Sequence, residues 1–174
     1  MDINQFFKEF KTEVDLLLEE DVLIGLERID ELEDGTYTLL FDIAMYHIAK
    51  KNNFTLLPEH PTGRGGYSDI TLFSSDGKKK LFEVEHENRP LHKNKNKRIA
   101  IYKSLDNLNL SKARYKILIT YTYKNISAEE LLDKCIKYLQ EKRLKIENLF
   151  LIYAKEDVGD GEDYFMIQLN CNLK

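Results

Sequence analysis

The segment GRGGYSDITLF at residues 63–73, followed after a short turn by LFEVEHEN at residues 81–88, decides how this chain folds. Polar and apolar residues alternate in both segments, over a background of β-branched and aromatic residues, which is typical of β-strands. Ser75, Asp76 and Gly77 between them are turn formers, and Gly77 suits the left-handed conformation that a three-residue hairpin loop requires. The two segments therefore predict an antiparallel hairpin.

The alternation also predicts which side chains share a face of this hairpin. Residues two apart point the same way, so three carboxylates, Glu83, Glu85 and Glu87, line one face. On the opposite face His86 lies beside the apolar residues of the strand, where we expect it to pack in the core.

Loop length determines where Asp69 lies relative to this face. A three-residue loop predicts Asp69 directly opposite Glu83, so that two carboxylates converge. A two-residue turn at Asp76-Gly77 would instead place Asp69 opposite Val84 and turn Asp69 and Glu83 to opposite faces. The predicted convergence depends on the longer loop or on a compensating bulge.

Facing carboxylates destabilise a sheet unless a positive charge lies between them. Oxygen ligands from Asp69, Glu83 and Glu85 suit a hard divalent cation, Mg²⁺ or Mn²⁺, which keeps several waters and can bridge to phosphates. The alternative is that the three glutamates form the solvent-exposed face of an edge strand.

Outward from the hairpin, hydrophobic periodicity predicts the element order ααβββαβαββ, an α/β or α+β domain with a mixed central sheet. We expect four helices: the first from residue 3 into the low twenties, the second from a cap at Thr36 or Thr38 to residue 52, the third at 95–109 and the fourth at 128–143. We expect six strands, at 54–60, 67–73, 79–86, 115–123, 148–154 and 164–173. Asp2 with Gln5, and Ser127 with Glu130, are spaced as capping boxes.

Length and composition place the chain in a broad class. The 174 residues predict one domain, 1–174, made of an acidic helical region at 1–34, a core at 36–124 and a C-terminal helix and strands at 125–174. No apolar run approaches the roughly 20 residues that cross a bilayer. Cys135 and Cys171 have no metal-site spacing, so we expect a reducing, cytoplasmic compartment.

Charge is unevenly distributed along the chain. Residues 1–34 carry twelve acids and three bases, whereas residues 78–103 carry nine bases and three acids. The basic stretch predicts a phosphate-bearing partner, although a solvated charged surface is the alternative. The candidate nucleic-acid-binding residues are Arg64, Lys93, Lys95, Lys97 and Arg98.

Ser68-Asp69 followed by Glu83-Val84-Glu85 resembles the signature of the PD-(D/E)xK nuclease superfamily. That family has an Asp near the start of one strand and an acid-x-Lys on the next, within an αβββαβ core, and the resemblance covers about residues 36–124. The chain departs from the pattern at two positions. Ser68 replaces the usual proline, and Glu85 stands where the family has lysine, as it does in a minority of type II restriction enzymes.

The resemblance implies a restriction-endonuclease-like fold with an extra N-terminal helix and a Mg²⁺-dependent endonuclease acting on DNA. Asp69 and Glu83 would hold the metal, with the Val84 carbonyl as a further ligand, and Glu85 would orient the water or help to hold the metal. Lys97 is a candidate for a migrated lysine. Glu59 is the first candidate for the additional acid that the family often contributes, ahead of Asp42 and Glu33.

The small size of the chain predicts a homodimer or a subunit of a larger complex, with the first helix as a candidate dimerisation element. Two other functions are open at this point. In one, the chain has lost catalysis, with Glu85 marking the lost lysine, and acts as a nucleic-acid- or protein-binding module. Alternatively, residues 2–34 could mimic DNA phosphates in an inhibitor or immunity-type protein.

Overall fold

A six-stranded mixed sheet organises the chain. The computed structural model describes residues 1–19, 34–61, 67–88, 91, 99–122, 127–155 and 164–169. The helices are α1 (Ile3–Glu19), α2 (Asp34–Lys51), α3 (Ala100–Leu110) and α4 (Ala128–Glu141). The strands are β1 (Thr55–Pro61), β2 (Tyr67–Phe73), β3 (Lys80–Glu87), β4 (Tyr115–Thr122), β5 (Leu149–Lys155) and β6 (Tyr164–Gln168).

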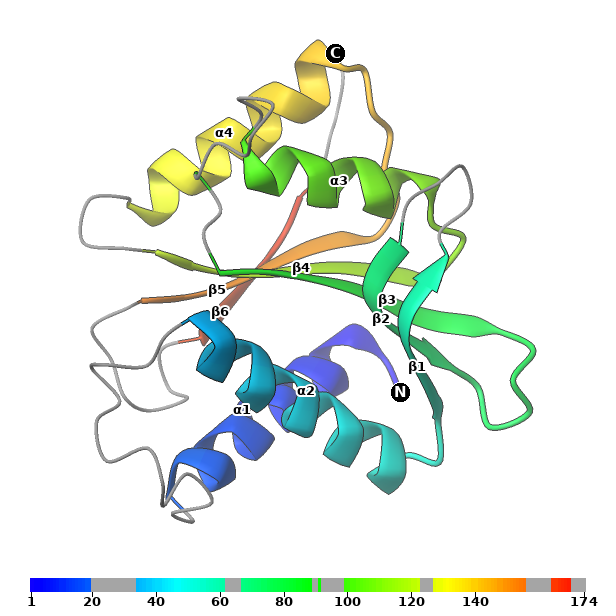
Figure 1. Cartoon of the computed structure of the whole chain (residues 1–174). Coiled ribbons are helices and arrows are strands. Elements are labelled where there is room, and N and C mark those ends of the chain that lie inside the picture. The colour runs from blue at the N-terminus through cyan, green and yellow to red at the C-terminus, as the bar shows by residue number, and fades with distance from the viewer. Residues whose placement is uncertain are drawn as a thin grey trace.

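The strands lie in sequence order across the sheet, β1-β2-β3-β4-β5-β6. β3, β4 and β5 are mutually parallel, whereas β1, β2 and β6 pair antiparallel with their neighbours. Helices α1 and α2 cover one face of the sheet, and α3 and α4 cover the other (Figure 1). The predicted order ααβββαβαββ and the mixed sheet flanked by helices are therefore confirmed.

Local capping determines where two of the helices begin. The backbone N–H of Gln5 donates to Asp2 Oδ1 at 2.9 Å, and the N–H of Glu130 donates to Ser127 Oγ at 3.1 Å, as the capping boxes predict. The predicted cap of the second helix is wrong, because α2 begins at Asp34. Helix α3 begins at Ala100, and most of the residues predicted to precede it in that helix lie outside the described part of the chain.

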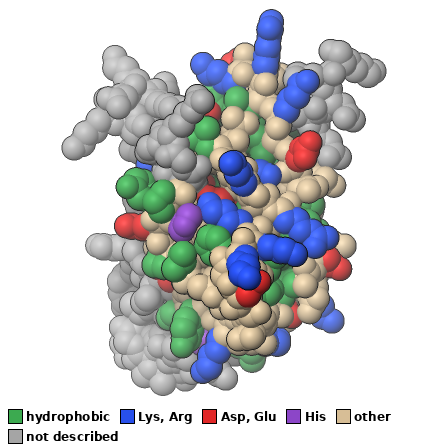
Figure 2. All heavy atoms as spheres, turned by 90° about the vertical axis from the view of Figure 1, so that its right-hand side faces the viewer, with side chains coloured by type: hydrophobic (Ala, Val, Ile, Leu, Met, Phe, Trp, Pro, Cys, Tyr) green, Lys and Arg blue, Asp and Glu red, His purple; other side chains and the backbone are tan. Residues whose placement is uncertain are grey.

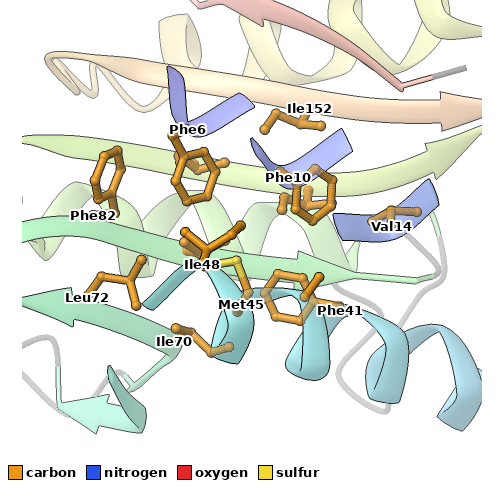
Figure 3. Close-up of a cluster of buried hydrophobic side chains, with 14 of the residues drawn as sticks. Phe6, Phe10, Val14, Phe41, Met45, Ile48, Ile70, Leu72, Phe82 and Ile152 are labelled. Carbon is orange, nitrogen blue, oxygen red and sulfur yellow. The ribbon is translucent and has the colours of Figure 1, made fainter. Parts of the chain in front are cut away.

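The core on the α1/α2 side is rich in aromatic residues (Figure 3). Phe6 of α1 stacks on Phe82 of β3 with ring centroids 4.7 Å apart, and Phe10 and Val14 continue the same buried stripe. The chain's own core thus covers the apolar stripe of the first helix. The predicted role of that helix in dimerisation remains untested.

A second core lies on the other face of the sheet, between β4, β5 and helices α3 and α4. Leu105, Leu118 and Leu139 are fully buried there. None of the helices within the described ranges is both long and apolar enough to cross a membrane.

The β2–β3 hairpin has a different register from the predicted one. Phe73 pairs with Lys80, but the next step on β2 corresponds to two on β3, so Leu72 pairs with Phe82 and Thr71 pairs with Glu83. The prediction that Asp69 lies directly opposite Glu83 is wrong. The predicted three-residue loop would pair Phe73 with Lys79, so the observed pair of Phe73 with Lys80 is already shifted by one residue, and the bulge shifts the register by one more. Continuing the register places Asp69 opposite Glu85. Gly77 adopts the predicted left-handed conformation, with φ 68°.

Candidate active site

Asp69 lies where β2 leaves β3. The pairing of the two strands ends at Ile70 and Val84, and beyond this point the backbone N–H of His86 donates to Asp69 Oδ2 at 2.7 Å. The Asp69 carboxylate thus accepts the hydrogen bond of a β3 backbone N–H where the ladder between β2 and β3 has ended. Although the residue as a whole is exposed, this bond turns its carboxyl group onto β3.

The sheet is also irregular on the other side of Asp69. Strand β1 pairs with β2 on both sides of Glu59, but Glu59 itself is left out of the ladder and has φ 46°. Left-handed backbone at a non-glycine residue costs free energy and is enriched at functional sites. At the level of Asp69, the ladder between β1 and β2 is therefore interrupted for one pair, and the ladder between β2 and β3 ends.

Glu85 faces Asp69 from β3 and is held by helix α3. Only 4% of Glu85 is exposed, and its Oε1 accepts a hydrogen bond from Asn107 Nδ2 at 3.2 Å. The same Asn107 nitrogen donates to the backbone carbonyl of Tyr67 at 3.0 Å. Asn107 therefore ties the Glu85 carboxyl to the first residue of β2, two residues before Asp69.

Burial and charge repulsion change the acidity of this pair. Burial raises the pKa of Glu85 to about 9, and the nearby Asp69 charge adds to the increase, while hydrogen bonds from Asn107 and Ser104 oppose it. Burial also raises the pKa of the Asp69 carboxyl, with a contribution from Asp42 and Glu59. The pair therefore favours either a bound proton or a bound cation.

Among the described residues, Lys103 of α3 is the cation whose charge acts on both carboxyls. Its charge lowers the pKa of Asp69 and of Glu85, although burial outweighs it at both residues. Lys103, Asn107 and Ser104 were not among the site residues predicted from the sequence. A signal was present, because Ser104, Asn107 and Ser111 are spaced at three and four residues and interrupt the apolar face of this helix.

Glu83 has a different environment from Asp69 and Glu85. It is fully buried, and its Oε2 accepts hydrogen bonds from Ser111 Oγ and, at 3.5 Å, from Lys80 Nζ. Lys116 of β4 pairs with Glu83 in the parallel register; burial lowers the pKa of that lysine, and the charges of Glu147 and Glu83 oppose the decrease. Glu83 Oε1 is buried and has no hydrogen-bond partner among the described residues. Cations and a hydroxyl thus compensate the charge on one side of the carboxylate, and the other oxygen remains a free acceptor.

Three residues are candidates for an additional acid at the site, Glu59, Asp42 and Glu33. Asp42 of α2 and Glu59 of β1 both lie near enough to Asp69 to raise its pKa. Glu33 lies outside the described residues, as do all five predicted nucleic-acid-binding residues, Arg64, Lys93, Lys95, Lys97 and Arg98.

His86 packs as predicted, on the face opposite the glutamates. Its ring stacks on Phe41 with centroids 4.4 Å apart, and its Nε2 lies 3.0 Å from Tyr121 Oη. Burial lowers the pKa of His86 to about 3. The side chain therefore stays neutral and structural, while its backbone N–H holds Asp69.

Comparison with protein-family models, with curated proteins and with solved structures gives no significant match to this chain. Within the described ranges, no three His, Cys, Asp or Glu side chains are grouped so that they could hold a metal ion together. What the site offers is thus one close carboxyl pair, Asp69 and Glu85, with Glu83 further along β3 and Lys103 nearby.

Proposed function

We propose that the chain is a metal-dependent endonuclease with a restriction-endonuclease-like fold, which hydrolyses phosphodiester bonds of DNA. One observation carries the proposal, the placement of the Asp69 and Glu85 carboxyls against each other where β2 leaves β3. Facing carboxyls with raised pKa values cost stability, and a divalent cation between them would lower both pKa values and remove the repulsion.

The residues present fit Mg²⁺ or Mn²⁺. Both ions favour carboxylate oxygens, and Mg²⁺ commonly takes only one or two carboxylates and keeps several waters, so the Asp69–Glu85 pair is a sufficient protein contribution. When bound, the metal supplies a water of lowered pKa and neutralises charge on the scissile phosphate.

The other residues of the site position these carboxyls. The His86 N–H fixes Asp69, and Asn107 fixes Glu85 against β2, so neither carboxyl has to be ordered when the metal and substrate arrive. Lys103 contributes a positive charge beside both. We propose that Lys103, rather than Lys97, compensates for the lysine that Glu85 replaces and contacts the phosphate.

A second function is supported by the acidity of Glu85. With a pKa of about 9, Glu85 is protonated at neutral pH when no cation is bound, and a protonated pair is a stable arrangement without a metal. An inactive nuclease-fold domain that binds nucleic acid or protein would keep this arrangement. Metal binding separates the two functions, because only a native state that binds the ion is stabilised by it.

The experiment is a cleavage assay on supercoiled plasmid, linear duplex and single-stranded DNA, with Mg²⁺, Mn²⁺ or EDTA. We compare the wild type with Asp69→Asn, Glu85→Gln and Lys103→Gln, and use Asp133→Asn, an exposed carboxylate on α4, as the matched control. Asparagine at position 69 keeps a side-chain oxygen for the His86 N–H, so loss of activity reports the charge rather than the fold.

We expect metal-dependent cleavage in the wild type and the control. Asp69→Asn and Glu85→Gln should reduce cleavage at least about 100-fold, since a group that stabilises transition-state charge typically contributes about 10²–10³. A folded wild type that cleaves no substrate and shows no metal-dependent thermal shift would overturn the nuclease proposal in favour of the inactive domain.

A further inference from the structure

A second feature lies at the opposite end of β3. Because β3, β4 and β5 are parallel, the three connections that lead into them, residues 74–80, 111–114 and 142–148, meet at one edge of the sheet. The backbone N–H of Arg114 donates to the Lys80 carbonyl at 3.2 Å, and Asn148 Nδ2 donates to the Arg114 carbonyl at 3.1 Å. The three connections therefore form one continuous surface, which we call the amino-end surface.

A buried lysine stabilises this surface from below. Lys116 Nζ donates to the carbonyls of Ala113 and Glu147, each at 3.1 Å, and so joins the second connection to the third. Only 8% of Lys116 is exposed. The backbone beneath the surface is thus pinned by side-chain hydrogen bonds.

The amino-end surface is strongly basic in a chain whose net charge is −4. Its basic residues are Lys78, Lys79, Lys80, Lys112, Arg114, Lys142, Arg143 and Lys145, and its acidic residues are Asp76 and Glu147. Figure 2 looks onto the side from which the β2–β3 hairpin projects, and Lys and Arg side chains gather there with a few acidic ones between them.

Most of these charges are not neutralised by the protein. In the part of the chain that the structure describes, neither Lys78 nor Lys79 of the hairpin, nor Lys112 or Arg114 beside it, forms an ion pair with a carboxylate. Asp76 instead accepts hydrogen bonds from Ser74 Oγ and the N–H of Lys78. Exposed unpaired bases concentrated on one surface repel each other and attract a polyanion.

We propose that the amino-end surface binds the sugar-phosphate backbone of duplex DNA. Phosphate recognition needs cations on a surface but no base-specific groups. The nearby aromatic rings favour a duplex over a single strand, because they are covered. Phe73 is partly buried beneath Lys80, whose Nζ lies 5.9 Å from the ring centroid, and Tyr115 is partly buried beneath Arg114, whose guanidinium carbon lies 5.0 Å from the ring centroid. Rings covered in this way offer no open platform for stacking unpaired bases.

This surface lies about 17 Å from Glu85, at about 3.4 Å per strand residue between Lys80 and Glu85. One turn of duplex spans about 34 Å, so one duplex can contact both places. The proposal goes beyond the nuclease function and does not depend on it, because backbone binding needs no metal.

The test is fluorescence anisotropy with a labelled 20-base-pair DNA duplex in EDTA, over about 50–200 mM salt, so that no cleavage occurs. The variants are Lys78→Gln/Lys79→Gln and Lys112→Gln/Arg114→Gln. The control, Lys134→Gln/Lys137→Gln, removes the same charge from α4, where both lysines are ion-paired. Thermal unfolding checks that every variant folds.

Each surface variant should weaken duplex binding at least about tenfold at 100 mM salt. The plot of the logarithm of the binding constant against the logarithm of the salt concentration should also become less steep by about 1–2, since each lost phosphate contact contributes about 0.9 to the magnitude of its slope. The control should retain both values.

Three results would overturn the proposal. These are unchanged duplex binding in both surface variants, an equal loss in the control, and single-stranded DNA binding as tightly as the duplex. Because these measurements exclude metal, loss of the docking surface and loss of the nuclease function are separate outcomes.

Discussion

Replacing Glu85 with glutamine should stabilise the protein at neutral pH when no metal is present. Glu85 has a pKa of about 9 in the folded protein against 4.5 for the free side chain. Between these values the unfolded chain releases the proton while the folded chain keeps it, so stability is lost as pH rises through this window. At pH 7.5 the difference covers about three pH units, which amounts to up to about 4 kcal/mol at 1.36 kcal/mol per unit.

Glutamine does not ionise and keeps an oxygen for the Asn107 amide, so Glu85→Gln removes this cost while preserving the hydrogen bond. The measurement is the free energy of unfolding in urea and EDTA at pH 4.5, 6.0 and 7.5. We expect the wild type and the variant to agree at pH 4.5 and to diverge as pH rises, with the variant more stable. Glu141→Gln, at an exposed position in α4, is the matched control.

Two outcomes would refute this reasoning. If Glu85→Gln is less stable than the wild type at pH 7.5, or if their difference does not change with pH, then Glu85 is ionised in the folded protein and the repulsion with Asp69 is already compensated. A repeat with Mn²⁺ links the prediction to function, because the cation should restore wild-type stability at pH 7.5 and leave the variant unchanged.

Three further predictions follow from the packing of single side chains. His86 has a pKa of about 3 in the folded protein against 6.5 for the free side chain, so it contributes stability that is lost as pH falls below 6.5. In His86→Phe, the free energy of unfolding in urea should therefore decline less between pH 6.5 and pH 4 than in the wild type. Phe82→Ala should cost about 3–5 kcal/mol in the same assay, because Phe82 is fully buried between Phe6 and Tyr115, and a loss below 1 kcal/mol would contradict this packing. Burial raises the pKa of the Cys135 thiol to about 12, so in Cys171→Ser a thiol reagent should label the native protein at least about 100-fold more slowly than the unfolded chain.

Local chemistry explains why much of the fold could be predicted. The caps at Asp2 and Ser127 and the left-handed Gly77 each depend on residues within a few positions in the chain, and all three form as expected. Strand alternation likewise predicts that His86 faces the core while Glu83 and Glu85 face the other way. The start of α2 was predicted wrongly, because the helix begins at Asp34, before both threonines that were predicted as its cap.

The candidate site could be predicted only in part. Asp69 and Glu85 were identified as site residues by their chemistry, but the prediction that Asp69 lies opposite Glu83 was wrong. The hairpin loop shifts the register by one residue, since Phe73 pairs with Lys80 rather than with Lys79, and a bulge beyond it shifts the register by one more. Strand alternation alone specifies neither shift. Lys103 and Asn107 were missed because a helix meets the sheet through residues distant in the chain.

Local backbone preferences and periods of two or 3.6 residues specify the elements, their order, the facing of side chains along each strand and the acidic residues available for chemistry. Long-range packing specifies that Glu85 rather than Glu83 meets Asp69, that α3 holds this pair, and that three separate basic connections meet at the amino ends of β3, β4 and β5. Each of these depends on strand register and on helix packing, where the stabilising contacts join residues far apart in the chain.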